Sequence, residues 1–212
     1  MPDILLRTRR LCFAYDDVDV LHDIDVELEA GAITAIVGPN GSGKSTLIEL
    51  MAGTAVPRLG VVERFATVAF VVQRTAILDT LPLSVRDVVD LGTWGRDAAG
   101  SSRSERRRAV AEAMERVGVA DLARRSIHEV SGGQRQRALI AQALARTART
   151  GGVLLLDEPS AGLDSESRGT IRGILAEEAS RGRAIGWVTH DDEDVAGADA
   201  VIRLRASAAV AE

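Results

Sequence analysis

The nine residues GPNGSGKST, Gly38 to Thr46, constrain the fold of this chain more than any other stretch. They fit the pattern G-x-x-x-x-G-K-[ST], follow the apolar run AITAIV and precede the run LIELMAG, which is compatible with a helix that closes at Gly53. Glycines let a backbone curl so that its amides point inward, and a helix N-terminus favours an anion. This unit therefore predicts a phosphate-binding loop between a buried strand and a helix.

Lys44 is the only lysine among the 26 Lys and Arg residues of the chain. A compact ammonium enters a ring of amides into which the broad planar guanidinium does not fit. We expect Lys44 to neutralise the outer phosphates of a nucleotide and the hydroxyl of Ser45 to ligate Mg²⁺. The predicted nucleotide-binding set takes in the whole loop: Gly38, Pro39, Asn40, Gly41, Ser42, Gly43, Lys44, Ser45 and Thr46.

The stretch GVLLLDEP supplies a second half of the same chemistry. An apolar strand that ends in Asp157 presents a carboxylate at the carboxyl edge of the sheet, where open α/β sheets bind ligands and where a metal partner is needed. Glu158 points elsewhere than its neighbour and is not needed to hold the metal. We therefore interpret Glu158 as a general base that polarises an attacking water.

Strand-like and helix-like runs alternate in the first and last thirds of the chain, which favours a parallel sheet with right-handed crossovers. Residues 1–74 and 151–205 are predicted to form this α/β core, 75–150 a helical insert and 206–212 a tail. In the insert, SVRDVV begins with a candidate serine cap, and SERRRAVAEAMERVG places Ala109, Val110, Ala113, Met114 and Val117 on one face. The Arg106–Arg108 run is interpreted as a solvated surface, with an anion or lipid contact as the alternative.

The net charge of −5 gives no general attraction to nucleic acid, so none is expected as a partner. The single cysteine cannot form an internal disulfide, and no Cys/His spacing resembles a zinc site. The sequence contains no run of 18 apolar residues and its start does not read as a secretory signal. A cytoplasmic location is expected, with any membrane role exerted through a partner.

The stretch SGGQRQR, Ser131 to Arg137, opens a second helix in the manner of a phosphate site but carries no lysine. Taken with VSGGQRQR, DEPSAGLD and VTHD, the chain resembles the ATP-binding cassette family, the ATPase subunits of ABC transporters, nearly end to end. The resemblance implies a nucleotide-binding α/β fold with a small N-terminal antiparallel β region and a helical subdomain. The interval from Ser45 to Gln73 is short for the family, which leaves the extent of that antiparallel sheet open.

By the same resemblance, Tyr15 stacks on adenine, Gln73 reaches the Mg²⁺ and the attacking water, and His190 is the switch histidine. Ser131, Gly132, Gly133 and Gln134 close over the γ-phosphate of ATP held by a second subunit, and Asp164 belongs to the loop after the acidic motif. The Mg²⁺ set is Ser45, Gln73 and Asp157, and the catalytic set is Glu158, His190 and Gln73. The implied partners are a second cassette in a head-to-tail homodimer and an integral-membrane permease.

The stretch FVVQRTAILDTLPLSVRDVVDLG resembles the ATPases of bacterial zinc, manganese and iron importers. We expect a metal-ion importer whose metal is carried by an extracytoplasmic binding protein and the permease, with the chain held on the inner face of the membrane. The alternatives are another ABC importer or exporter, a soluble iron–sulfur assembly ATPase without a permease, and a non-catalytic nucleotide-binding scaffold. Glu158 and His190 argue against the scaffold, which needs neither a base nor a switch residue.

Overall fold

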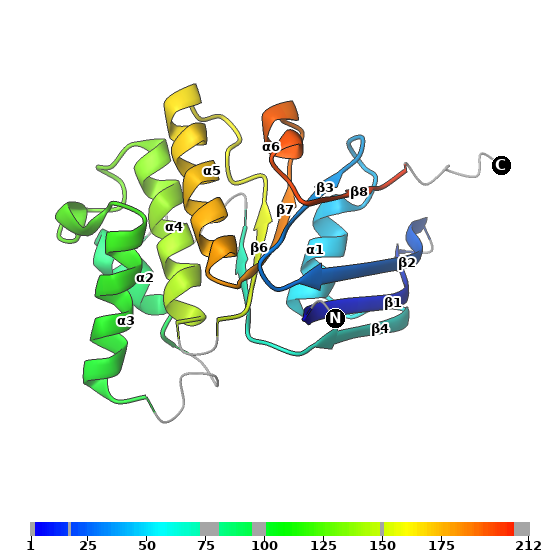
Figure 1. Cartoon of the computed structure of the whole chain (residues 1–212), viewed down its shortest axis with the longest axis horizontal. Coiled ribbons are helices and arrows are strands. Elements are labelled where there is room, and N and C mark those ends of the chain that lie inside the picture. Colours follow the sequence, from blue (N-terminus) through cyan, green and yellow to red (C-terminus); the bar gives the residue numbers. More distant parts are fainter. Residues whose placement is uncertain (1–2, 17, 73–80, 95–100, 149–150, 206–212) are drawn as a thin grey trace.

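A computed structural model describes residues 3–16, 18–72, 81–94, 101–148 and 151–205 of the chain. Its elements follow in this order: β1 Ile4–Tyr15, β2 Val18–Glu29, β3 Ile33–Val37, α1 Lys44–Ala52, β4 Leu59–Arg64, β5 Val68–Val71, α2 Val85–Leu91, α3 Arg103–Arg116, the short 3-10 helix η3 Ala120–Leu122, α4 Gly132–Arg146, β6 Val153–Asp157, α5 Ser165–Ser180, β7 Ala184–Val188, α6 Asp192–Ala196 and β8 Ala200–Arg203. Figure 1 shows the strands at the centre and right of the molecule and most helices at the left.

The central sheet has five strands in the order β5-β6-β7-β3-β8, and every neighbouring pair is parallel. β3, β6 and β7 are each five residues long and fully buried, which is why they appear in the sequence as continuous apolar runs rather than alternating ones. Parallel strands of this kind need covering on both faces. The predicted α/β class and parallel sheet are confirmed.

Alternate residues of each central strand point into two different cores. In β6, Leu154 and Leu156 join the core beneath α2–α5, whereas Val153 and Leu155 join the core beneath α1 and the antiparallel sheet. Figure 1 accordingly shows α4 and α5 on one side of the parallel sheet and α1 with β1, β2 and β4 on the other. β3 and β6 end at Val37 and Asp157, at the carboxyl edge of this sheet.

The small antiparallel sheet is present and has the order β2-β1-β4. β1 and β2 are long paired strands, and β4 uses the six residues Leu59–Arg64 to pair with β1. The short interval between Ser45 and Gln73 left the extent of this sheet open. The structure shows that the interval still contains a third strand, β4, which pairs with β1. Leu6, Leu11 and Leu28 anchor this sheet in the same core as α1.

The helices begin and end close to the predicted positions. α1 closes at Gly53 in the left-handed conformation, and Ser84 caps α2 in a capping box with Asp87. α3 begins at Arg103, slightly earlier than the sequence suggested, because Ser102 and Glu105 form a capping box there. The short α6 was not predicted, since five residues beginning with an acidic cluster show no helical periodicity.

The face of α3 buries Val110, Ala113 and Met114 as predicted, with Val117 buried at its end, while Arg106–Arg108 are exposed. Arg108 pairs with Glu112 one turn on. Among the described residues, no helix is long and apolar enough to cross a lipid bilayer.

Candidate nucleotide-binding site

The loop from Gly38 to Gly43 joins the end of β3 to the start of α1. Gly41 and Gly43 have φ angles of 79° and 87°, a left-handed backbone that L side chains rarely adopt. A Cβ on Gly43 would also lie 2.7 Å from the Leu21 side chain. α1 begins without any side-chain cap and without acidic residues in its first turn, so the positive end of the helix faces this loop uncompensated.

Lys44 is the first residue of α1, and its side chain folds back over the loop. The residue is only 8% exposed, and Nζ donates hydrogen bonds of 2.9 Å to the carbonyl oxygens of both Gly38 and Pro39. An ammonium group has three donors, so one remains to face a ligand. The ammonium is therefore held at the mouth of the loop in a fixed orientation.

An open pocket of about 470 Å³ lies over this loop. It is lined by Tyr15, Val20, Asn40, Gly41, Gly43, Lys44, Ser45, Thr46 and Glu158. Tyr15 is 51% exposed at the rim, with its ring edge-on to Phe13 at 4.8 Å between centroids. An exposed aromatic ring beside a phosphate loop suits a nucleobase. Of the predicted loop residues, Gly38, Pro39 and Ser42 are not in the lining, and Ser42 is buried.

Asp157 is the last residue of β6 and is 9% exposed. Burial raises the pKa of its carboxyl group, and the neighbouring Glu158 charge adds to this, whereas a hydrogen bond from Ser45 and the charge of Lys44 oppose it. The hydroxyl of Ser45 thus lies close enough to the carboxylate of Asp157 to stabilise its charged form. One hydroxyl and one carboxylate side by side at the edge of a phosphate pocket are the oxygen donors that Mg²⁺ takes when substrate phosphates complete its shell, so these residues fit that ion.

Glu158 belongs to the same pocket but differs from Asp157 in its backbone. Its φ of 47° lies in the left-handed region, a strained conformation for a residue with a side chain, and its amide donates to the carbonyl of Val188 at 3.1 Å. This turn directs the two adjacent carboxylates differently. Nδ1 of His190 lies 3.7 Å from Oε1 of Glu158. The predicted general base and the predicted switch histidine are therefore neighbours in the folded chain.

The signature loop, by which we mean the residues Ser131–Gln134 that are expected to close over the ATP of a second subunit, lies away from this pocket. Ser131 caps α4 and forms a capping box with Gln134, whose side-chain oxygen accepts from the Ser131 amide at 2.9 Å. Ser131 and Gly132 are exposed, and none of the four predicted residues Ser131–Gln134 lines the described pocket. Gln134 therefore uses its side chain within the loop, which the sequence alone did not indicate.

The start of α4 packs against the start of α5 instead. A Cβ on Gly133 would lie 2.5 Å from Oγ of Ser167. Asp164 caps α5 by accepting from the amide and the hydroxyl of Ser167, and these hydrogen bonds lower the pKa of its carboxyl group. The structure thus brings Asp164 and the signature loop together, while Gln73 lies outside the described residues.

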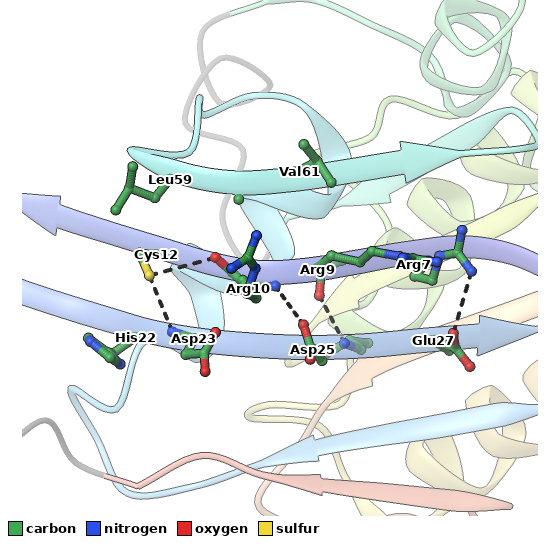
Figure 2. Close-up of a pocket in the computed structure, with 13 residues that line it drawn as sticks. Arg7, Arg9, Arg10, Cys12, His22, Asp23, Asp25, Glu27, Leu59 and Val61 are labelled. Atoms are coloured by element: carbon green, nitrogen blue, oxygen red, sulfur yellow. Dashed lines mark hydrogen bonds and ion pairs between the residues drawn. The ribbon is translucent and has the colours of Figure 1, made fainter.

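A larger hollow, about 1040 Å³, lies on the outer face of the antiparallel sheet (Figure 2). Several of its charged groups are already paired: Arg7 pairs with the neighbouring Glu63 at 2.8 Å and with Glu27 at 3.9 Å, and the carboxylate of Asp25 accepts from the Arg10 backbone amide. Neither a helix N-terminus nor the phosphate loop contributes to its lining. The nucleotide site is therefore the smaller pocket.

Two residues of the site were missed by the sequence interpretation. Val20 lines the pocket from β2, and nothing in the sequence distinguishes it from any other apolar residue of a strand that is only partly buried. Asp194 lies buried behind Glu158 and His190, at 1% exposure. It belongs to the acidic run DDED, in which the sequence does not distinguish it from its three acidic neighbours. Its position four residues after His190 is the one signal that could have identified it.

A model of the family described as ABC transporter matches residues 21–161. The zinc transport system ATP-binding protein TroB of Treponema pallidum is 37% identical over 195 residues, which cover 88% of this chain and 72% of that protein. The manganese transport system ATP-binding protein MntB of Listeria innocua is 35% identical over 195 residues, covering 88% and 80%.

Among solved structures, an inward-facing ABC transporter assigned to the metal-chelate type superposes with a TM-score of 0.83 at 29% identity and covers 95% of this chain and 79% of that one. A nucleotide-free ATP-binding cassette from an ABC transporter, 21% identical, also reaches 0.83 over 96% and 88% and supports the fold. The chain belongs to the ABC transporter family and is one of its ATPase cassettes.

Proposed function

We propose that this chain hydrolyses Mg²⁺-bound ATP in the pocket over the β3–α1 loop and thereby drives a membrane permease that imports a divalent metal ion. The observation that carries the nucleotide chemistry is that Lys44, Ser45 and Glu158 line one pocket, while the carboxylate of Asp157 lies next to all three. These are the parts that phosphoryl transfer needs: a cation for the phosphates, oxygen donors for a metal ion and a carboxylate for the attacking water.

Each group has a defined task in this mechanism. The loop amides and the one available N–H of Lys44 bind the β- and γ-phosphates, and Tyr15 covers the base. Ser45 and Asp157 would hold Mg²⁺ with Gln73, and the ion neutralises charge on the phosphate oxygens when bound. Glu158 takes the proton of the water that attacks the γ-phosphorus as the bond to the ADP oxygen breaks. His190, 3.7 Å away, orients Glu158 and the γ-phosphate.

The site needs a second cassette to be complete. The described pocket is open, and Ser131–Gln134 are not among the residues that line it. We propose that the same residues of a second copy close over the γ-phosphate, with the amide of the exposed Gly132 and the Ser131 hydroxyl as donors. Asp164, at the neighbouring helix start, would shape this interface.

We assign permease docking to the predicted insert, residues 75–150, whose described part contains α2, α3 and α4. α2 is the helix that corresponds to the VRDVV segment, and two large apolar side chains near it are exposed: Leu81 at 44% and Trp94 at 63%. Exposed apolar side chains that flank a helix suit a coupling helix of a membrane protein. This contact would hold the chain at the inner face of the membrane.

The cargo is inferred from relatives. TroB and MntB are named for zinc and manganese transport, respectively. A macrolide export protein of Aeromonas hydrophila, MacB 2, is 36% identical over 215 residues, but these cover only 32% of that larger protein. Export by another cassette type is accordingly the second candidate. In either case the described residues hold no cluster of three His, Cys, Asp or Glu side chains that could bind a metal.

The test measures zinc, manganese and iron in cells that lack this chain and in cells that carry Lys44→Ala, each grown under limitation of one metal. We expect one metal to fall selectively in both strains, because loss of the ammonium removes the charge that holds the phosphates. The purified Lys44→Ala protein should lose ATP turnover by roughly 100-fold or more. Unchanged metals with intact wild-type ATPase activity would contradict metal import but leave the cassette chemistry in place.

A further inference from the structure

The carboxylate of Asp194 is the most buried acidic group near the nucleotide pocket. Its residue is 1% exposed, although it belongs to the short surface helix α6. Oδ2 accepts hydrogen bonds from the hydroxyls of Thr189 at 2.7 Å and Ser160 at 3.2 Å, and Oδ1 accepts from Arg172 at 3.2 Å. A buried carboxylate is tolerated when it is paired and hydrogen-bonded in this way.

The two hydroxyls come from the two segments that carry the reacting groups. Ser160 stands two residues after Glu158, and Thr189 immediately precedes His190. A single oxygen atom thus ties the turn that holds the proposed base to the strand end that holds the histidine. The Glu158 amide also donates to the carbonyl of Val188, which immediately precedes Thr189. The two segments are therefore linked at two successive points, Val188 and Thr189.

The need for such a tie follows from the backbone. Glu158 is held at a φ of 47°, which is strained for a residue with a side chain and persists only where the surroundings enforce it. The lining of the small cleft beside it includes Ser160, Thr189 and His190. Arg172, from α5, holds the Asp194 carboxylate from the other side and also pairs with Glu193 at 2.6 Å.

We infer that Asp194 is a positioning residue for ATP hydrolysis, acting through Ser160 and Thr189 to hold the Glu158 carboxylate and the His190 ring in register. The inference rests on the proposed role of Glu158. Asp194 is not among the residues that line the nucleotide pocket, so it acts on the chemical step and not on nucleotide binding.

The decisive variant is Asp194→Asn, which keeps the shape but removes the charge and one of the two acceptor oxygens. We expect kcat for ATP to fall by roughly 10- to 100-fold, since misplacement of a reacting group by about 1 Å costs this much. KM and the affinity for a non-hydrolysable ATP analogue should stay within about twofold. Asp192→Asn, an exposed acid of the same helix, is the matched control and should leave kcat unchanged.

Two further variants test the positioning role without changing the buried charge of Asp194, whose loss could itself destabilise the fold. Thr189→Val and Ser160→Ala each remove one hydroxyl while leaving Asp194 in place. Each should lower kcat without changing nucleotide affinity, and each should add little in the Asp194→Asn background, because contacts within one network are not additive.

The outcomes separate the two claims. Wild-type protein that turns over ATP, with Asp194→Asn equally active, would overturn the positioning role. A parallel fall of kcat, nucleotide affinity and melting temperature in all three variants would also overturn it, because that pattern is the loss of folded protein. Wild-type protein that does not hydrolyse ATP would instead contradict the proposed function on which the inference stands.

Discussion

At the scale of single residues, the buried charge of Asp157 lowers the stability of the folded chain, and the proposed role in holding Mg²⁺ explains why a carboxylate stands there. Burial raises the pKa of its carboxyl group, so the charged form is disfavoured in the folded chain relative to the unfolded chain. The penalty is complete above the raised pKa and vanishes below the ordinary value of 3.8. We therefore expect Asp157→Asn to raise the melting temperature of the nucleotide- and metal-free protein at pH 7, with the gain disappearing on acidification. Melts across pH test this against Asp192→Asn, and a lower melting temperature at pH 7 would contradict it.

At the scale of elements, the contact between the first turns of α4 and α5 has no room for a side chain. A Cβ on Gly133 would lie 2.5 Å from Oγ and 2.9 Å from Cβ of Ser167, whereas one on Gly132 would meet only a flexible end of Leu163 at 3.4 Å. Gly133→Ala should therefore cost about 1–3 kcal/mol by forcing the helices apart, and Gly132→Ala should change stability by about 0.5 kcal/mol or less. Urea unfolding of both variants measures the difference, and equal stabilities would show that the crossing is looser than described.

At the scale of the whole molecule, one cassette presents two incomplete halves of a nucleotide site. The pocket contains Lys44 and Glu158 but not Ser131, and Ser131 and Gly132 at the start of α4 are exposed. We expect Glu158→Gln, which binds ATP but removes the base, to accumulate as a dimer when ATP is saturating. Sedimentation velocity with and without ATP measures this, and addition of Lys44→Ala to the variant should return it to monomer. A Glu158→Gln protein that stays monomeric with bound ATP would refute the head-to-tail arrangement.

The local sequence was sufficient for the parts of the site that lie within one strand–loop–helix unit. The lone Lys44, the spaced glycines and the apolar strand ahead of them predicted the loop, because backbone curl and helix-end charge depend on neighbours along the chain. The acidic pair at residues 157 and 158 was predictable for the same reason. Fully buried strands and capped helices were recognised from local pattern and propensity.

The tertiary structure decided what depends on distant segments. Val20 enters the pocket because β2 passes beside Gly43, and Asp194 serves the site because α6 packs behind two strand ends. Neither contact leaves a periodic trace in the sequence. The sequence by itself determined the phosphate chemistry and its family, since these reside in contiguous motifs. Only the folded chain decided that Glu158 and His190 meet and that Asp194 lies behind them, because those relations are distances across the sheet.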